Sequence, residues 1–258
     1  MRLIDTHLHL YDEAFDSDRD EAILRMRHAG VEKCILPAID RSSFERQSSL
    51  ARHHKGFMWQ ALGLHPTSVN ENWKDELQFV KDELNRNRAD YVAIGEIGLD
   101  GYWSREFMQE QKEVFREQLL LAAEYGLPVI IHLREATDDL FEVLNNLHTV
   151  PLKGVFHAFS GSVESYRRLK KYGDLKFGIG GVVTYRNAGL AKTLPLIPLE
   201  DLLLETDAPW LAPVPFRGKR NESAYIVNVA QKIAEIKGTD IDSVAQATSA
   251  NAEKLFGI

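Results

Sequence analysis

Short apolar runs alternate with longer stretches of mixed polarity along almost the whole chain. A short run bounded by polar residues is typical of a buried strand, whereas apolar positions that recur every three or four residues indicate a helix. Regular alternation of the two predicts βα units around a parallel sheet. The expected strands are residues 3–6, 33–36, 58–63, 92–95, 129–132, 154–156, 176–179 and 202–205.

Helical patterns separate these strands, at residues 18–29, 43–54, 73–87, 107–125, 136–147, 163–171 and 188–194. Eight strands with intervening helices predict a (β/α)8 barrel of the TIM type. Two further helices, near residues 222–237 and 240–256, would complete its outer wall. We find no linker, low-complexity tract or internal repeat, so residues 1–258 are expected to form a single domain.

Six potential metal ligands stand at or just past the carboxyl ends of the expected strands: His7, His9, Glu96, His132, His157 and Asp207. Side chains alternate along a strand, so His7 and His9 point to the same side. In a closed parallel barrel the carboxyl ends of all strands open onto one face, where these residues would converge. Imidazole and carboxylate donors suit zinc, manganese, iron or nickel, and a carboxylate that bridges two ions would suit a binuclear hydrolase.

Each of these residues also has an ordinary structural interpretation, because a lone histidine is more often hydrogen-bonded than bound to a metal. Four of the nine histidines fall in helical or loop stretches: His28, His53, His54 and His148. The other five all follow apolar runs: His7, His9, His65, His132 and His157. This concentration favours a metal centre. Asp207 could instead cap a helix. Asp5 and Glu205 could support the ligands, or could form a simple ion pair or a buried hydrogen bond.

Composition narrows the class of protein. A hydrophobic content of 44% supplies a sizeable core, and no apolar run reaches the length of about 18 residues that predicts a membrane span. Met1 leads almost directly into the first strand, which leaves no room for a signal peptide. Cys34 lies in an apolar run and is expected in the core. These features predict a cytoplasmic protein, and nothing in the sequence indicates an obligate protein partner.

The net charge of −7 argues against broad, nonspecific coating of nucleic acid. Arg217, Lys219 and Arg220 nevertheless form a dense basic cluster soon after Asp207, which is expected either to bind a polyanionic substrate or to be a solvated loop. Arg220 could also pair internally. Several aromatic residues follow strand ends and could either stack bases or pack loops: Tyr102, Trp103, Phe159, Tyr185 and Trp210. Arg134 and Arg186 could contact phosphate or pair with surface carboxylates.

Several longer motifs contain these residues. They are Asp5-Thr6-His7-Leu8-His9, Gly63-Leu64-His65-Pro66, Gly95-Glu96-Ile97-Gly98-Leu99-Asp100, Pro128-Val129-Ile130-Ile131-His132 and Leu204-Glu205-Thr206-Asp207-Ala208-Pro209. Together they resemble the successive motifs of TatD-family deoxyribonucleases. The segments 217–222 and 251–258 extend the resemblance over essentially the whole chain. Local departures are Ser223, where many relatives have proline, and the loop Gly101-Tyr102-Trp103-Ser104.

The resemblance implies a metal-dependent hydrolase of the amidohydrolase superfamily with a (β/α)8 fold. It also implies two divalent metal ions, such as magnesium, manganese or zinc. One ion would be held by His7, His9, Glu96 and Asp207. The other would be held by Glu96, His132 and His157, with Glu96 as the bridge. His65 would contact the substrate phosphate. The position of Asp207 at the end of the last strand suits it to orient or deprotonate the attacking water.

We therefore expect a deoxyribonuclease that hydrolyses DNA phosphodiester bonds by a metal-activated water, as a 3′–5′ exonuclease on exposed ends. The expected partner is DNA that is single-stranded or has exposed 3′ ends. The same chemistry could attack a carbonyl, so the alternative is a deacylase or esterase, for example one that acts on aminoacyl-tRNA. A non-enzymatic metal-binding scaffold is a weaker alternative, because it would not need so many ligands at a cleft.

Overall fold

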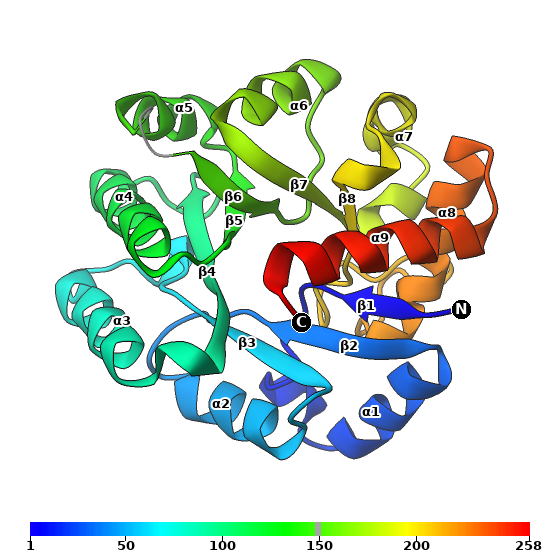
Figure 1. Cartoon of the computed structure of the whole chain (residues 1–258), viewed down its shortest axis with the longest axis horizontal. Coiled ribbons are helices and arrows are strands. Elements are labelled where there is room, and N and C mark those ends of the chain that lie inside the picture. Colours follow the sequence, from blue (N-terminus) through cyan, green and yellow to red (C-terminus); the bar gives the residue numbers. More distant parts are fainter. Residues whose placement is uncertain (148–150) are drawn as a thin grey trace.

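Eight parallel strands form one sheet in the order β1 to β8 in the computed structural model, which describes residues 1–147 and 151–258 (Figure 1). The strands are β1 (Leu3–Asp5), β2 (Val31–Leu36), β3 (Met58–Leu62), β4 (Tyr91–Asp100), β5 (Val129–Arg134), β6 (Leu152–Phe156), β7 (Gly173–Ile179) and β8 (Leu202–Leu204). The sheet closes just past β1 and β8, where Thr6 N donates to Leu204 O at 3.0 Å and Asp207 N donates to His7 O at 2.9 Å. The expected (β/α)8 barrel is confirmed.

Helices surround the ring of strands (Figure 1). They are α1 (Arg19–His28), α2 (Phe44–His53), α3 (Trp73–Asn87), α4 (Met108–Tyr125), α5 (Thr137–Asn146), α6 (Val163–Leu169), α7 (Leu190–Thr193), α8 (Ile226–Lys237) and α9 (Ile241–Phe256). Most elements begin and end close to the expected residues. The main exception is β4, which continues through Glu96 to Asp100 rather than ending at Gly95. His148, expected in a helical or loop stretch, lies outside the described residues.

The last helix differs from its expected place in the outer wall. A small apolar cluster takes one side chain from each of seven strands and joins them to Ala252, Leu255 and Phe256 of α9. Neighbouring strand residues belong instead to the larger cluster beneath the outer helices. Because side chains alternate along a strand, the small cluster lies inside the barrel. Helix α9 therefore closes one end of the barrel, and Figure 1 shows it crossing the ring of strands.

Two further expectations concern burial. Cys34 is fully buried within the larger cluster, as expected of a core cysteine. Within the described part of the chain, no helix has both the length and the apolar character needed to cross a bilayer.

Candidate metal centre

Glu96 lies at an irregular point of β4. The β4–β5 pairing gains one residue on β4 between Ile94 and Ile97, so that Gly95 and Glu96 together oppose Ile130 alone. Such a β-bulge redirects a side chain. A Cβ atom at position 95 would lie 2.5 Å from the Cβ of Ile130, so glycine is required beside the bulge. The result is a buried carboxylate that faces imidazoles from β5 and from the segments that follow β1 and β6.

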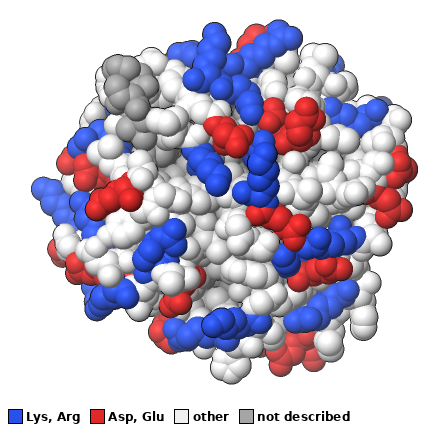
Figure 2. Space-filling view, viewed as in Figure 1, with Lys and Arg blue, Asp and Glu red and all other residues white. Residues whose placement is uncertain are grey.

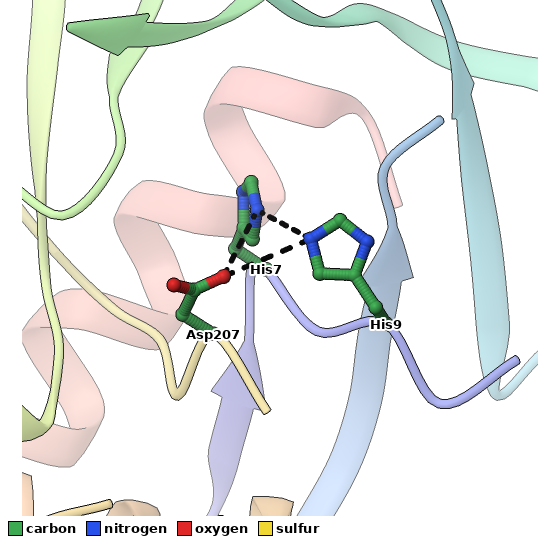
Figure 3. Close-up of side chains that lie close together, drawn as sticks. All are labelled: His7, His9 and Asp207. Carbon is green, nitrogen blue, oxygen red and sulfur yellow. Dashed lines mark hydrogen bonds and ion pairs between the residues drawn. The ribbon is translucent and has the colours of Figure 1, made fainter. Parts of the chain in front are cut away.

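Four donor atoms surround one point beside Glu96, and Figure 3 shows three of the side chains turned toward one another. The Nε2 atoms of His7 and His9 lie 3.2 Å apart. Asp207 Oδ1 lies 3.6 Å from His7 Nε2 and 3.7 Å from His9 Nε2. Glu96 Oε2 lies 3.2 Å from His7 Nε2 and 3.6 Å from His9 Nε2. Donors about 2.1 Å from a tetrahedrally coordinated ion are about 3.4 Å from one another, so these spacings fit a metal ion.

Hydrogen bonds determine which nitrogen of His9 faces this point. Tyr11 Oη donates to Pro37 O at 2.6 Å, so the Tyr11 oxygen accepts the proton of His9 Nδ1 at 2.8 Å. His9 Nε2 therefore carries a lone pair. A lone pair directed at the Glu96 and Asp207 oxygens in a buried site is repulsive unless a cation lies between them. The chemistry of the donor set therefore calls for a cation.

The second carboxylate oxygen of Glu96 faces three other imidazoles. Oε1 lies 2.9 Å from His157 Nε2, 3.0 Å from His132 Nδ1 and 3.1 Å from His65 Nε2. The neutral form of His132 donates its Nε2 proton to Asp100 Oδ2 at 2.8 Å and keeps a lone pair on Nδ1. The ligating nitrogens of His132 and His157 lie 3.3 Å apart. Glu96 thus divides its two oxygens between two sets of donors, as a bridging carboxylate does.

His65 differs from the other imidazoles in its hydrogen bonds. Its Nδ1 accepts from the Thr67 N–H at 3.1 Å, at the start of the 3₁₀ turn Pro66–Ser68. Its Nε2 then carries the proton and donates to Glu96 Oε1. A protonated nitrogen is not a metal ligand, but it can donate to a phosphate oxygen. This geometry is chemically compatible with the substrate contact that the resemblance implies for His65.

Buried carboxylates lie behind the ligands. Asp5 accepts from Thr206 N at 3.0 Å, from Thr206 Oγ1 at 2.7 Å and from Ser223 Oγ at 2.6 Å. These bonds tie the end of β1 to the segment that follows β8, so both ligand-bearing segments share one support. They also give Ser223 a structural role at the position where it departs from the family pattern. Glu205 Oε1 lies 3.6 Å from His157 Nδ1.

Two residues that orient ligands were not singled out from the sequence. Asp100 follows Glu96 by an even spacing on β4, which places both on the same face of the strand and is a usable signal. Tyr11 orients His9 through its hydroxyl, but it follows the ligands in an irregular segment. No periodic pattern marks a hydroxyl in such a segment, so Tyr11 could be found only from the structure.

Burial and neighbouring charges set the protonation of the centre. Burial raises the pKa of Asp207 to about 6, although the imidazoles of His157 and His7 act in the opposite direction. Burial also acts to raise the pKa of Glu96, but His157 and the neighbouring imidazoles outweigh it and hold that pKa well below its usual range. Burial lowers the pKa of His9 well below its usual value. An ionised Glu96 and a neutral His9 are the forms that bind a metal.

Backbone strain is concentrated around the same site. Among the described residues, four other than glycine have positive φ: Glu135 at 50°, Ala158 at 46°, Asp207 at 58° and Leu211 at 55°. All four lie in the segments that follow β5, β6 and β8. Such conformations cost about 1–3 kcal/mol each and persist where the surrounding structure enforces them. The fold therefore holds these segments in conformations that they would not adopt alone.

The donors open into a cavity of about 420 Å³. Its lining includes six residues besides the donors and their partners: Ile39, Thr67, Trp103, Arg134, Trp210 and Leu211. Trp210 packs edge-on against His9, with ring centroids 4.9 Å apart. The cavity therefore has an apolar, aromatic rim above a charged floor.

The predicted basic cluster does not line this cavity. Arg217 and Lys219 are exposed to solvent. Arg220 is held by Asp18, at 2.6 and 2.8 Å, and by Glu222 at 2.9 Å. The internal pairing that the sequence left open for Arg220 is the arrangement observed, so its guanidinium is largely occupied.

The chain is similar over almost its whole length to proteins of one family. The family model described as TatD related DNase matches residues 4–257. The uncharacterized metal-dependent hydrolase YabD of Bacillus subtilis is 39% identical over 257 residues, which cover 99% of each chain. The 3′-5′ ssDNA/RNA exonuclease TatD of Erwinia amylovora is 35% identical, with 99% of this chain and 100% of that protein covered. The crystal structure of YjjV, a TatD homologue from Escherichia coli K12, matches with a TM-score of 0.92 and 36% identity, covering 100% of this chain and 98% of that one.

Proposed function

This chain belongs to the TatD family of metal-dependent hydrolases, and we propose that it is a divalent-metal-dependent deoxyribonuclease. In this proposal it acts as a 3′–5′ exonuclease on single-stranded DNA or on exposed 3′ ends. The similarity to a relative named as a 3′-5′ ssDNA/RNA exonuclease supports the substrate class and the polarity. The observation that carries the proposal is the division of the Glu96 oxygens between two donor sets, because phosphodiester hydrolysis suits a two-ion site.

The proposal gives each part of the centre a role. Two divalent ions bound there would supply Lewis acidity, both to activate water and to neutralise charge on the phosphate. Asp207 orients the attacking water and accepts its proton. His65 keeps its proton on Nε2, because its Nδ1 is engaged by Thr67. This N–H donates to Glu96 Oε1 in the structure, and it would donate to a phosphate oxygen when substrate is bound.

Attraction of a polyanion has to be local in a chain whose net charge is −7. Figure 2 shows the face crossed by α9, at the end of the barrel away from the metal centre, where Lys and Arg are interspersed with Asp and Glu. Arg217 and Lys219 follow the last strand and are exposed. The guanidinium carbon of Arg217 lies 4.5 Å from the centroid of the Tyr185 ring. We assign the guiding role to these two residues and leave out Arg220, whose charge is already paired.

The test uses metal-free protein and 5′-end-labelled substrates: single-stranded DNA, double-stranded DNA and single-stranded RNA, with aminoacyl-tRNA assayed in parallel. We expect no hydrolysis without metal. Adding a divalent ion should restore a ladder of products that shorten from the 3′ end. Release of the amino acid from aminoacyl-tRNA, with DNA left intact under the same conditions, would replace the nuclease with the deacylase. Cleavage within the strand, without shortening from the 3′ end, would contradict the exonuclease assignment.

A further inference from the structure

The exposed aromatic side chains gather at the rim of the metal cavity. Among the described residues, eight large hydrophobic side chains are exposed: Met1, Leu24, Tyr102, Trp103, Leu196, Trp210, Leu211 and Val214. The three aromatic ones follow β4 or β8, and Trp103 is 72% exposed although it lines the cavity. Exposed aromatic surface is unfavourable in water and marks a binding surface when it is concentrated beside a cleft.

Arg134 is the cation that belongs to this rim. Its guanidinium carbon lies 3.5 Å from the Tyr102 ring centroid and 5.7 Å from that of Trp103. Over residues 1–147 and 151–258, no carboxylate forms an ion pair with Arg134, whereas the nearby Arg105 is paired with Asp139 at 2.7 Å. A guanidinium stacked through its face keeps its N–H edge free for a phosphate.

Arg134 also lines a second cavity, of about 340 Å³. Among the residues that the structure describes, Arg134 and His157 alone line both cavities. The second cavity has Phe159 and Ser160 in its wall. The Arg134 side chain can therefore contact a ligand in either cavity.

Asp100 connects the rim to the metal centre. One carboxylate oxygen accepts the proton of His132 Nε2 at 2.8 Å. The other accepts from the backbone N–H groups of Tyr102 at 2.9 Å and Trp103 at 3.3 Å. One buried carboxylate therefore fixes both a metal ligand and the aromatic loop, which sets the distance between them.

We propose that Tyr102, Trp103 and Arg134 form a nucleotide-binding platform that holds an unpaired base and the phosphate next to the scissile one. This inference rests on the proposed nuclease function and adds the residues that select a single strand. Trp103 stacks on the base, and Arg134, supported by Tyr102, binds the phosphate as the strand passes toward the second cavity. A base within a duplex is already stacked on both faces, so the platform takes single-stranded substrate.

The test compares the wild type with Trp103→Ala and Trp103→Phe on a single-stranded oligonucleotide. Stacking on one aromatic residue corresponds to about a tenfold change in KM or Kd. We expect Trp103→Ala to raise KM about tenfold with kcat little changed, and Trp103→Phe to restore most of the loss. Bis(p-nitrophenyl) phosphate has aromatic rings that could stack on Trp103, so the control is an oligonucleotide that lacks every base, and its KM should be equal in all three proteins.

Two further experiments identify the base that Trp103 contacts and test the part that Arg134 plays in strand binding. Oligonucleotides that lack a single base, at successive positions from the 3′ end, should include one on which the wild type and Trp103→Ala have the same KM. Arg134→Gln should weaken strand binding, whereas Arg116→Gln, which removes an exposed arginine on the outer helix α4, should not. Equal KM values for wild type and Trp103→Ala on the intact strand, or a loss that no missing base removes, would overturn the platform.

Nucleotide binding by the platform can be tested separately from hydrolysis. Failure of the metal-loaded wild type to hydrolyse both DNA and bis(p-nitrophenyl) phosphate would contradict the proposed function. Oligonucleotide binding to the metal-free proteins, measured as Kd, would still test the platform in that case. An unchanged Kd in both Trp103→Ala and Arg134→Gln would refute it.

Discussion

Substitution of Asp100 by asparagine tests how the fold selects the ligating nitrogen of His132. The asparagine oxygen can still accept the Tyr102 and Trp103 N–H groups, so its NH2 group must face His132 Nε2. Two donors would then oppose each other. His132 relieves this contact by moving its proton to Nδ1, which removes the lone pair that faces Glu96.

The expected loss of metal affinity is confined to one of the two donor sets. Removal of a carboxylate that orients a ligating histidine lowers metal affinity by about 10–100-fold, which corresponds to about 1.4–2.7 kcal/mol. Asp100 makes no hydrogen bond or ion pair with His7, His9 or Asp207, so the affinity of that set should be preserved.

Calorimetric titration of metal-free protein with a divalent ion should therefore show one unchanged binding step and one weakened step. Asp201→Asn is a matched control, because Asp201 is also buried but pairs with Tyr166 at 2.7 Å and Lys170 at 2.8 Å. Thermal unfolding of the metal-free variants checks that the fold is retained. Two unchanged steps in well-folded Asp100→Asn would refute the argument that this carboxylate sets the His132 tautomer.

Three other predictions concern the division of labour. Anomalous diffraction from metal-loaded protein should locate two ions that share Glu96, and Glu96→Gln should lower the ion-to-protein ratio in elemental analysis; one fully occupied site remote from Glu96 would contradict this. Asp207→Asn should lower kcat by about 10²–10⁴-fold with little change in KM, whereas His65→Ala should mainly raise KM. The metal content of both variants is verified first. Unchanged turnover in metal-loaded Asp207→Asn would exclude Asp207 as the base. Replacing Arg217 and Lys219 by glutamine should make the affinity for single-stranded DNA depend less on salt. The slope of log affinity against log salt concentration should fall in magnitude by about 0.7 for each phosphate that is no longer neutralised. Identical slopes in the wild type and the variant would show that this loop does not guide the strand.

The barrel could be predicted because its strands and helices leave separate periodic signals. The length of strand β4 could not be predicted in this way. Its apolar run ends at Gly95, but pairing with β5 continues through the bulge to Asp100. A bulge depends on the partner strand, so the apolar run alone does not show that the strand continues past it. Helix α9 shows the same restriction, since its apolar face does not reveal whether it packs beside the barrel or across its end.

The donor types could be read from the sequence, but their protonation could not. His9 and His65 both follow apolar runs, yet Tyr11 leaves a lone pair on one Nε2 and Thr67 leaves a proton on the other. These neighbours come from local turns that carry no periodic signal. The basic cluster shows a related difficulty, because Arg220 is neutralised by Asp18, which is distant in sequence.

The closed end of the barrel has a consequence for how a polymer would be digested. The apolar layer completed by α9 fills the interior beneath the metal centre, so the described side chains block the way through the barrel to its other end. In the proposed nuclease, a strand bound at the metal centre could not be threaded through, and a released mononucleotide would leave at the face from which the strand entered. Product departure and strand advance would then compete for the same face of the barrel. This arrangement favours distributive digestion, in which the strand dissociates between cuts, over processive degradation.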